Sequence, residues 1–222
     1  SNGCNAEYIC IAEDMVIEHK PTNISHQEAA PVCDGFLTSY NFLKDVGTLK
    51  QGQHILINGA SGSLGSAAVQ LAKIMGAKVT AVCSTRNIDF VKSLGADIVI
   101  DYTKTSINNI QGTYDLIYDS VGVLNYNKSK KLLEPQGVFM IPVLSGQILW
   151  QMLCNPKKVK FAATGIKKTN DLKPLFSDLV NFFKQGKLHA NINKTYSLLD
   201  IVKAHQHIET GHKIGNIVMI NQ

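Results

Sequence analysis

The sequence predicts an α/β fold in which helices cover both faces of a doubly wound, six-stranded parallel sheet. From Gln53 to Lys184, short runs rich in β-branched residues alternate with amphipathic segments. The runs are almost continuously apolar, which is typical of strands buried on both faces. With 45% hydrophobic and 18% charged residues in 222, the chain can bury a large core. Its length suits one large domain, or one domain with a small second unit.

Each element of the sheet follows from this alternation. The expected strands, in chain order, are His54–Asn58, Lys78–Cys83, Ile98–Asp101, Tyr114–Ser120, Val138–Val143 and Val159–Thr164. The expected helices between and after them are Ser63–Met75, Ile88–Leu94, Asn125–Leu133 and Lys173–Lys184. Six strands with helical crossovers fit the doubly wound architecture.

The two ends of the chain do not follow this alternation. Near the start, Ala6–Ala12 predicts a strand, and Ser25 with Glu28 forms a capping box that predicts a helix from His26. A second helix carries Leu37, Tyr40 and Leu43 on one face. At the other end we expect a strand, a helix and a strand over Ile192–Leu198, Leu199–Ile208 and Ile217–Ile220. With Ala6–Ala12, these pieces indicate a smaller β-rich unit.

Charge and cysteine usage exclude several classes of protein. The net charge of +5 comes from scattered lysines and arginines, without the aromatic residues or motif of a nucleic-acid site. A mildly positive field would attract an anionic ligand. Five widely spaced cysteines give neither a disulfide framework nor a CxxC zinc lobe, and they indicate a reducing, cytoplasmic compartment. No signal peptide or membrane-length apolar run is present, so we expect no membrane partner.

The strongest motif is a glycine-rich turn between the first expected strand and its helix. It runs Asn58-Gly59-Ala60-Ser61-Gly62-Ser63-Leu64-Gly65. Gly59 and Gly62 allow a tight turn and close approach of a diphosphate, and Gly65 lets the helix pack close to the sheet. Free N–H groups and the helix dipole favour the anion. In this strand–turn–helix context the motif predicts a Rossmann dinucleotide site.

The residues after the second strand favour NADPH over NADH. A carboxylate there would hold the ribose 2′-hydroxyl of NAD, but the strand continues into Ser84, Thr85 and Arg86, and the next acidic residue along the chain is Asp89. The two hydroxyls can donate to a 2′-phosphate, and the guanidinium can make a charge-assisted contact. We therefore expect NADPH as the cofactor.

Several blocks together resemble the medium-chain dehydrogenase/reductase superfamily, and most closely its quinone oxidoreductase (zeta-crystallin-like) branch. The blocks are Gln27–Ala30 leading to Leu37–Tyr40, Gly52–Gly65, Leu94–Asp97 with Ile100–Tyr102, Asp115–Gly122 and Gly211–Asn216. They span most of the chain. The resemblance implies hydride transfer from NADPH to a small-molecule acceptor, a quinone or an α,β-unsaturated carbonyl.

The same resemblance implies roles for individual residues. Thr38 and Val143, the latter on the fifth strand, would lie near the nicotinamide, and Ser61, Gly62, Ser63 and Leu64 would hold the diphosphate. Ser84, Thr85, Arg86 and Tyr102 would surround the 2′-phosphate and adenosine, and Ser120 and Val121 would border the ribose and adenine. Packing at a strand end is the alternative for Tyr102, Ser120 and Val143. Members usually dimerise through the sixth strand, here near Phe161–Gly165.

Members of the resembled family begin with a GroES-like domain, and this sequence starts near the end of that domain. We therefore expect a truncated form, with residues 1–32 a remnant of that domain, 33–186 the Rossmann domain and 187–222 a return to the GroES-like unit. Ser1-Asn2 reads as a cloning remnant. Such a chain would fold its Rossmann half and bind NADPH but turn over poorly.

A metal site is not expected. Asp34 takes the place of a zinc ligand in zinc-dependent relatives, with Cys33 adjacent, but a catalytic zinc needs three protein ligands. His205 and His207 diverge on a helix, and His212 falls in a loop. No residue has the placement of a proton relay, so the catalytic residues stay unassigned. Two alternatives stay open: a zinc-dependent alcohol dehydrogenase, and a non-catalytic NADPH-binding protein.

Overall fold

A computed structural model describes residue 6 and residues 8–220. The main sheet has six parallel strands in the order β3-β2-β1-β4-β5-β6. Their bounds are β1 His54–Asn58, β2 Lys78–Cys83, β3 Ile98–Asp101, β4 Tyr114–Asp119, β5 Leu133–Ile141 and β6 Val159–Phe161. The predicted doubly wound fold is confirmed, and the chain order reverses between β1 and β4. In such sheets ligands bind outside the carboxyl ends of the strands at this switch point.

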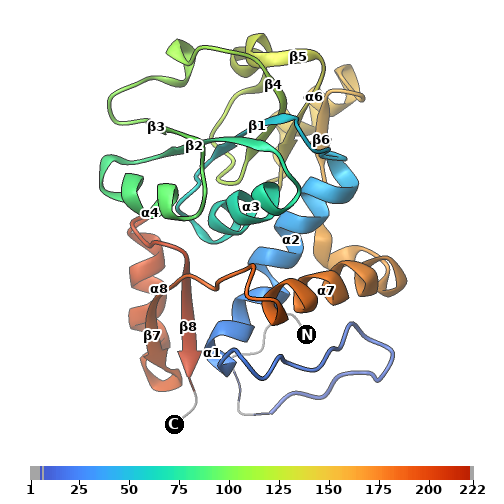
Figure 1. Cartoon of the computed structure of the whole chain (residues 1–222), viewed down its shortest axis with the longest axis vertical. Helices are drawn as coiled ribbons and strands as arrows, with labels where there is room; N and C mark the ends of the chain where they lie inside the picture. The colour runs from blue at the N-terminus through green and yellow to red at the C-terminus, as the bar shows by residue number, and fades with distance from the viewer. Residues whose placement is uncertain (1–5, 7, 221–222) are drawn as a thin grey trace.

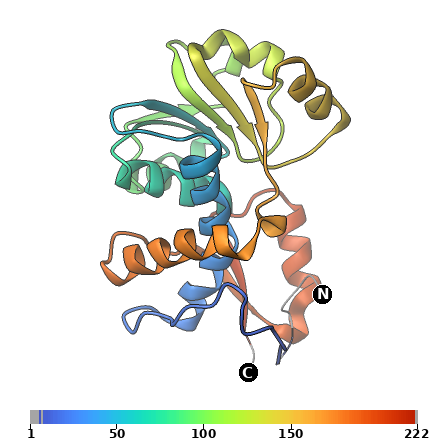
Figure 2. The same ribbon diagram turned by 90° about the vertical axis from the view of Figure 1, so that its right-hand side faces the viewer.

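Helices cover both faces of the sheet (Figures 1 and 2). They are α1 His26–Ala29, α2 Gly35–Asn41, α3 Ser63–Ile74, α4 Ile88–Ser93, α5 Tyr126–Ser129, α6 Gly146–Cys154, α7 Thr169–Lys184 and α8 Ile201–Glu209. Short helical turns are η1 Ala30–Cys33, η2 Phe42–Val46, η3 Thr85–Asn87, η4 Ile107–Asn109, η5 Lys130–Leu132, η6 Thr164–Ile166 and η7 Leu198–Asp200.

The core lies in two layers because successive strand residues point to opposite faces. Ile55 and Ile57 of β1 pack with α2, α3, α4 and α7 on one face. Leu56 of the same strand packs with α5 and α6 on the other. The capping box of α1 forms as predicted, with Ser25 Oγ accepting from the Glu28 N–H at 3.1 Å.

A second, parallel sheet pairs β7 (Ile192–Ser197) with β8 (Asn216–Ile220), and α8 connects them. This C-terminal unit, residues 187–220, lies below the main sheet in Figure 1. It meets the glycine-rich turn where Gly62 and Gly215 form a parallel β-bridge, and it meets α3 where the His189 N–H donates to Gln70 Oε1 at 2.9 Å. The unit therefore meets the glycine-rich turn directly.

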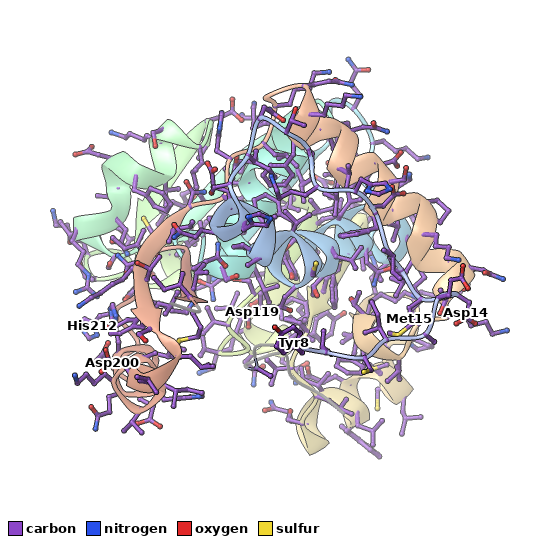
Figure 3. All side chains as sticks on the ribbon, turned by 90° about the horizontal axis from the view of Figure 1, so that it is seen from below. Tyr8, Asp14, Met15, Asp119, Asp200 and His212 are labelled. Atoms are coloured by element: carbon purple, nitrogen blue, oxygen red, sulfur yellow. The ribbon has the colours of Figure 1, made fainter. Side chains whose placement is uncertain are left out.

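The predicted strand at Ala6–Ala12 is wrong. The described residues there form no strand, and Tyr8 is 91% exposed. A strand needs a neighbouring strand for its N–H and C=O groups, and none of the described strands pairs with this segment. Figure 3, seen from below, shows the segment with Tyr8 and Met15 running along the outside of the molecule.

Several boundaries also differ from the prediction, because the sequence pattern does not mark the ends of elements sharply. The fifth strand starts earlier, at Leu133, through a register shift against Tyr114, and ends at Ile141 before Val143. The sixth strand ends at Phe161, and η6 follows. Helix α6 was not predicted, since its apolar run carries no charged face to reveal a helical period.

Candidate functional site

The glycine-rich turn takes the conformation that a close backbone approach requires. Gly59 has φ +77°, and a Cβ there would lie 2.2 Å from Val121 Cγ2. A Cβ on Gly65 would lie 2.1 Å from the Gly59 carbonyl oxygen. Gly62 caps the start of α3, so the first N–H groups of that helix lack acceptors within the helix. The start of α3 thus presents N–H groups without acceptors in the helix, together with the positive end of the helix dipole.

A cavity of about 770 Å³ opens in front of this turn, at the carboxyl ends of β1, β2 and β4. Asn58 and Cys83 line it from the ends of β1 and β2, and Val121 from the segment after β4. Ile208, Gly211 and Lys213 of the C-terminal unit also line it. The cavity has the size and position of a site for a small ligand in this architecture.

All the charged side chains that line the cavity are cationic. They are Arg86, Lys104 and Lys213, and none of the described lining residues is an aspartate or glutamate. A concave wall with charges of one sign focuses the field and attracts an anion. The cavity therefore suits an anionic ligand.

The cavity brings together half of the predicted site residues. Lining it are Ser61, Gly62, Ser84, Arg86, Tyr102 and Val121. Ser61 and Gly62 belong to the turn, whereas Ser84, Arg86 and Tyr102 follow β2 and β3. These two groups come from different strand ends, so the site has a turn end and a β2–β3 end.

Thr85 does not line the cavity, although Ser84 and Arg86 beside it do. Its hydroxyl donates to Asp101 Oδ2 at 2.5 Å and lies 2.9 Å from Thr103 Oγ1. The hydroxyl of Thr85, followed by that of Thr103, lowers the pKa of the Asp101 carboxyl. The donor predicted for a 2′-phosphate is thus engaged with a carboxylate of the neighbouring strand.

The other predicted residues lie around the cavity rather than in its wall. Ser63 Oγ donates to Asn216 Oδ1 at 2.5 Å, and Ser120 Oγ donates to the Asn58 carbonyl at 2.7 Å. Thr38 is half-buried on α2, which packs against α3. Leu64 lies in the first turn of α3, and Val143 packs against Gly122 in the loop after β5 rather than on the strand.

The lining residues that the sequence did not predict include Asn87, Lys104 and Lys213. Asn87 Nδ2 donates to Ser61 Oγ at 2.9 Å and so fixes the side chain of the turn. Lys104 follows β3 closely, so its place near a strand end was a usable signal. Lys213 is far from the turn in sequence, and nothing in the local pattern marks it.

Burial shifts the pKa values of two side chains at the site, Cys83 and Lys213. Burial raises the pKa of the Cys83 thiol to about 11, and the nearby Asp101 carboxylate adds to this. Burial lowers the pKa of the Lys213 ammonium, and the attraction of Asp34 opposes the shift. A partly desolvated ammonium gains more from an anionic partner than a fully solvated one does.

The residues at the zinc-ligand position do not form a metal site. Asp34 and Cys33 are exposed, and the described part of the chain contains no cluster of three or more His, Cys, Asp or Glu that could hold an ion. His207 Nδ1 lies 3.0 Å from the Tyr196 hydroxyl, and His212 is exposed on the C-terminal unit (Figure 3). These donors do not fit a catalytic zinc.

Comparison with known proteins identifies the family. Residues 94–219 match the family model described as zinc-binding dehydrogenase, over more than half of the chain. The chain belongs to this family. It is 31% identical to the chloroplastic quinone-oxidoreductase homolog of Spinacia oleracea, over 99% of this chain and 69% of the relative. The resemblance to the medium-chain superfamily and its quinone oxidoreductase branch is thereby confirmed.

Two further relatives show the extent of the match. A 2-methylene-furan-3-one reductase of Solanum lycopersicum is 33% identical over 98% of this chain and 52% of its own length. The structure of the quinone oxidoreductase from Coxiella burnetii superposes with a TM-score of 0.87 at 28% identity, over 99% of this chain and 68% of that one. The chain therefore spans about half of the length of the Solanum lycopersicum relative.

No helix among the described residues is long and apolar enough to cross a membrane.

Proposed function

We propose that the chain binds NADPH in the cavity in front of the glycine-rich turn, as the cofactor domain of a quinone- or enone-reducing oxidoreductase. The observation that carries the proposal is the wall of this cavity. Its described residues include three cations and no carboxylate, and it adjoins the N-terminal end of α3. A dinucleotide diphosphate and a 2′-phosphate are the anions that such a wall would neutralise.

The preference for NADPH rests on the β2–β3 end of the cavity. Arg86 and Lys104 lie there with Ser84, so a 2′-phosphate would meet two cations and a hydroxyl. The Asp101 carboxylate does not line the cavity; it accepts from Thr85 Oγ1 and lies 3.9 Å from Lys104 Nζ.

The residues of the chain would bind and orient the cofactor and exclude water, while bound NADPH supplies the hydride. The turn would hold the diphosphate, and the apolar side chains of Val121, Val123 and Ile107 would shield the adjoining groups from solvent. We assign no catalytic acid or base. Protonation of the product by solvent after hydride transfer is consistent with this.

The names of the relatives indicate the class of electron acceptor. One is a furanone reductase, whose substrate has an exocyclic carbon–carbon double bond next to a carbonyl, and others are quinone oxidoreductases. Both classes are electron-poor and accept hydride without a metal. We therefore propose a zinc-independent reduction.

Calorimetric titration of the chain with NADPH and NADH tests the cofactor proposal. We expect NADPH to bind at least about tenfold more tightly, a difference of about 1.4 kcal/mol. An equal or stronger affinity for NADH would overturn the specificity.

Reduction of a quinone and of an enone, followed through the absorbance of NADPH, tests the reaction. Zinc bound at one equivalent would favour the alcohol dehydrogenase alternative, and cofactor binding without turnover by the longer protein would favour a non-catalytic role.

We also propose that the chain forms a homodimer through the free edge of β6. The adjoining helix α6 supports this, because Leu149, Trp150 and Leu153 are 51%, 66% and 70% exposed on its outer side. An unpaired strand edge beside such an apolar surface is a typical pairing site. A second copy, pairing edge to edge, would bring the two α6 helices together.

The domain bounds 1–32, 33–186 and 187–222 and the cytoplasmic compartment also remain proposals. Four described cysteines, only one of them buried, support a reducing compartment. The spinach relative is named as chloroplastic, so an organelle is the alternative. Imaging of the tagged full-length protein in cells distinguishes the two.

A further inference from the structure

The C-terminal unit is fastened to the glycine-rich turn at two places. Gly62 and Gly215 form the β-bridge, in which the Gly215 N–H donates to the Ser61 carbonyl at 2.7 Å, and Ser63 Oγ donates to Asn216 Oδ1. Asn216 is itself held, because its Nδ2 donates to the Asn191 carbonyl at 3.1 Å. The start of β8 therefore keeps a fixed position relative to the turn.

This attachment places the Lys213 side chain near the turn. Lys213 lies two residues before Gly215, lines the cavity, and is half-buried. Its Nζ donates to the Gly215 carbonyl at 2.8 Å, and that residue bridges to Gly62. The neighbouring His212 is exposed at the surface (Figure 3). It is not one of the residues that line the cavity. Of this loop, the lysine is thus the side chain that faces the ligand space.

We infer that Lys213 is a ligand of the cofactor diphosphate and clamps it against the glycine-rich turn from the C-terminal unit. The inference rests on the proposed function and names a residue that acts on a part of the ligand common to NADPH and NADH. A diphosphate at the start of α3 would lie between the helix N–H groups and this ammonium. Charge-assisted hydrogen bonds to phosphate are about twice as strong as neutral ones.

The position of Lys213 separates its role from that of the other cations. Arg86 and Lys104 follow β2 and β3, at the end of the cavity expected to take the 2′-phosphate. Lys213 comes from the C-terminal unit, and its Nζ bonds the carbonyl of Gly215, which bridges to Gly62 of the turn. Loss of Arg86 should therefore affect NADPH alone, whereas loss of Lys213 should affect every ligand that carries the diphosphate.

Calorimetric titration with NADPH, NADH and ADP-ribose tests this assignment. Lys213→Met keeps the length of the aliphatic stem, and we expect it to weaken all three ligands about tenfold. Lys213→Arg should stay within about threefold of the wild type, since the charge and donors remain. Arg86→Met should weaken NADPH about tenfold and leave NADH and ADP-ribose unchanged. Lys203→Met is the matched control, because Lys203 pairs with Asp200 away from the cavity.

The outcomes are distinct. Wild-type affinity of Lys213→Met for NADH and ADP-ribose would overturn the inference, and a loss confined to NADPH would overturn it in favour of a 2′-phosphate contact. A wild-type chain that binds none of the three would refute the proposed function itself. Thermal unfolding checks that each variant is folded, and Lys213→Gln, with the same expected loss, replaces the Met variant if that one is not.

Discussion

Replacement of Gly65 by alanine tests the geometry on which the cofactor site depends. A Cβ at this position would lie 2.1 Å from the Gly59 carbonyl oxygen and 2.7 Å from Ala60 Cα. The first distance is roughly 1.4 Å shorter than the ~3.5 Å of a favourable contact. Both neighbours are backbone atoms of the turn, so no side-chain rotation can relieve the overlap. Helix α3 or the turn itself must move.

The expected cost can be set against the usual gain. In an open helix, Gly→Ala stabilises by about 1 kcal/mol. Here both neighbours are backbone atoms, so overpacking should cost about 3 kcal/mol, the upper end of the usual range, and the net loss should be about 2 kcal/mol. For a chain of this size that lowers the melting temperature by about 2–4 °C per kcal/mol. Displacement of the turn should also weaken NADPH binding.

Urea unfolding and NADPH calorimetry measure the two effects. Gly146→Ala is the matched control, because a Cβ there has no neighbour within 4 Å, and it should be neutral or slightly stabilising. If Gly65→Ala matches that control in both stability and affinity, the close approach of α3 to the turn is not a requirement of this site.

Three further predictions test other parts of the structure. Burial raises the pKa of the Cys83 thiol from 9.0 to about 11, so at pH 7.5 it should carry roughly a hundredfold less thiolate than a thiol with the ordinary pKa. Peptide mapping after iodoacetamide treatment should therefore find Cys83 labelled far more slowly than the exposed Cys154. Equal labelling rates would contradict the burial of Cys83. Partial burial raises the pKa of Asp97, but the hydrogen bonds from Lys73 and the Val79 N–H outweigh it and leave the pKa lowered. The stability from Asp97 is therefore present above the unfolded pKa near 4 and is lost as the pH falls through the folded pKa. Asp97→Asn should reduce the free energy of unfolding in urea by less than about 1 kcal/mol at pH 7 and leave it unchanged at pH 2.5, and a larger loss at the lower pH would contradict this sign. Trp150→Glu should convert the proposed dimer into a monomer, as measured by light scattering, and should leave the affinity for NADPH unchanged. A wild-type chain that is already monomeric would rule out the interface on α6.

The sequence by itself determined the main sheet and its turn. The strands at His54–Asn58, Lys78–Cys83 and Ile98–Asp101 have the predicted bounds, because buried parallel strands are continuous apolar runs that glycine and polar residues interrupt. Gly59, Gly62 and Gly65 were predictable for a similar reason. Their conformations and close approaches depend on neighbours within a few residues, or on the helix that follows directly.

Only the tertiary structure decided which side chains share the cavity. Lys213 meets the turn through a bridge between Gly62 and Gly215, residues more than a hundred positions apart, and no local pattern encodes such a contact. Thr85 is engaged with Asp101 because β2 and β3 end side by side. Ala6–Ala12 alternates like a strand but has no partner among the described strands. Periodicity reports the preferences of a segment, whereas pairing and charge neighbours depend on what folding brings beside it.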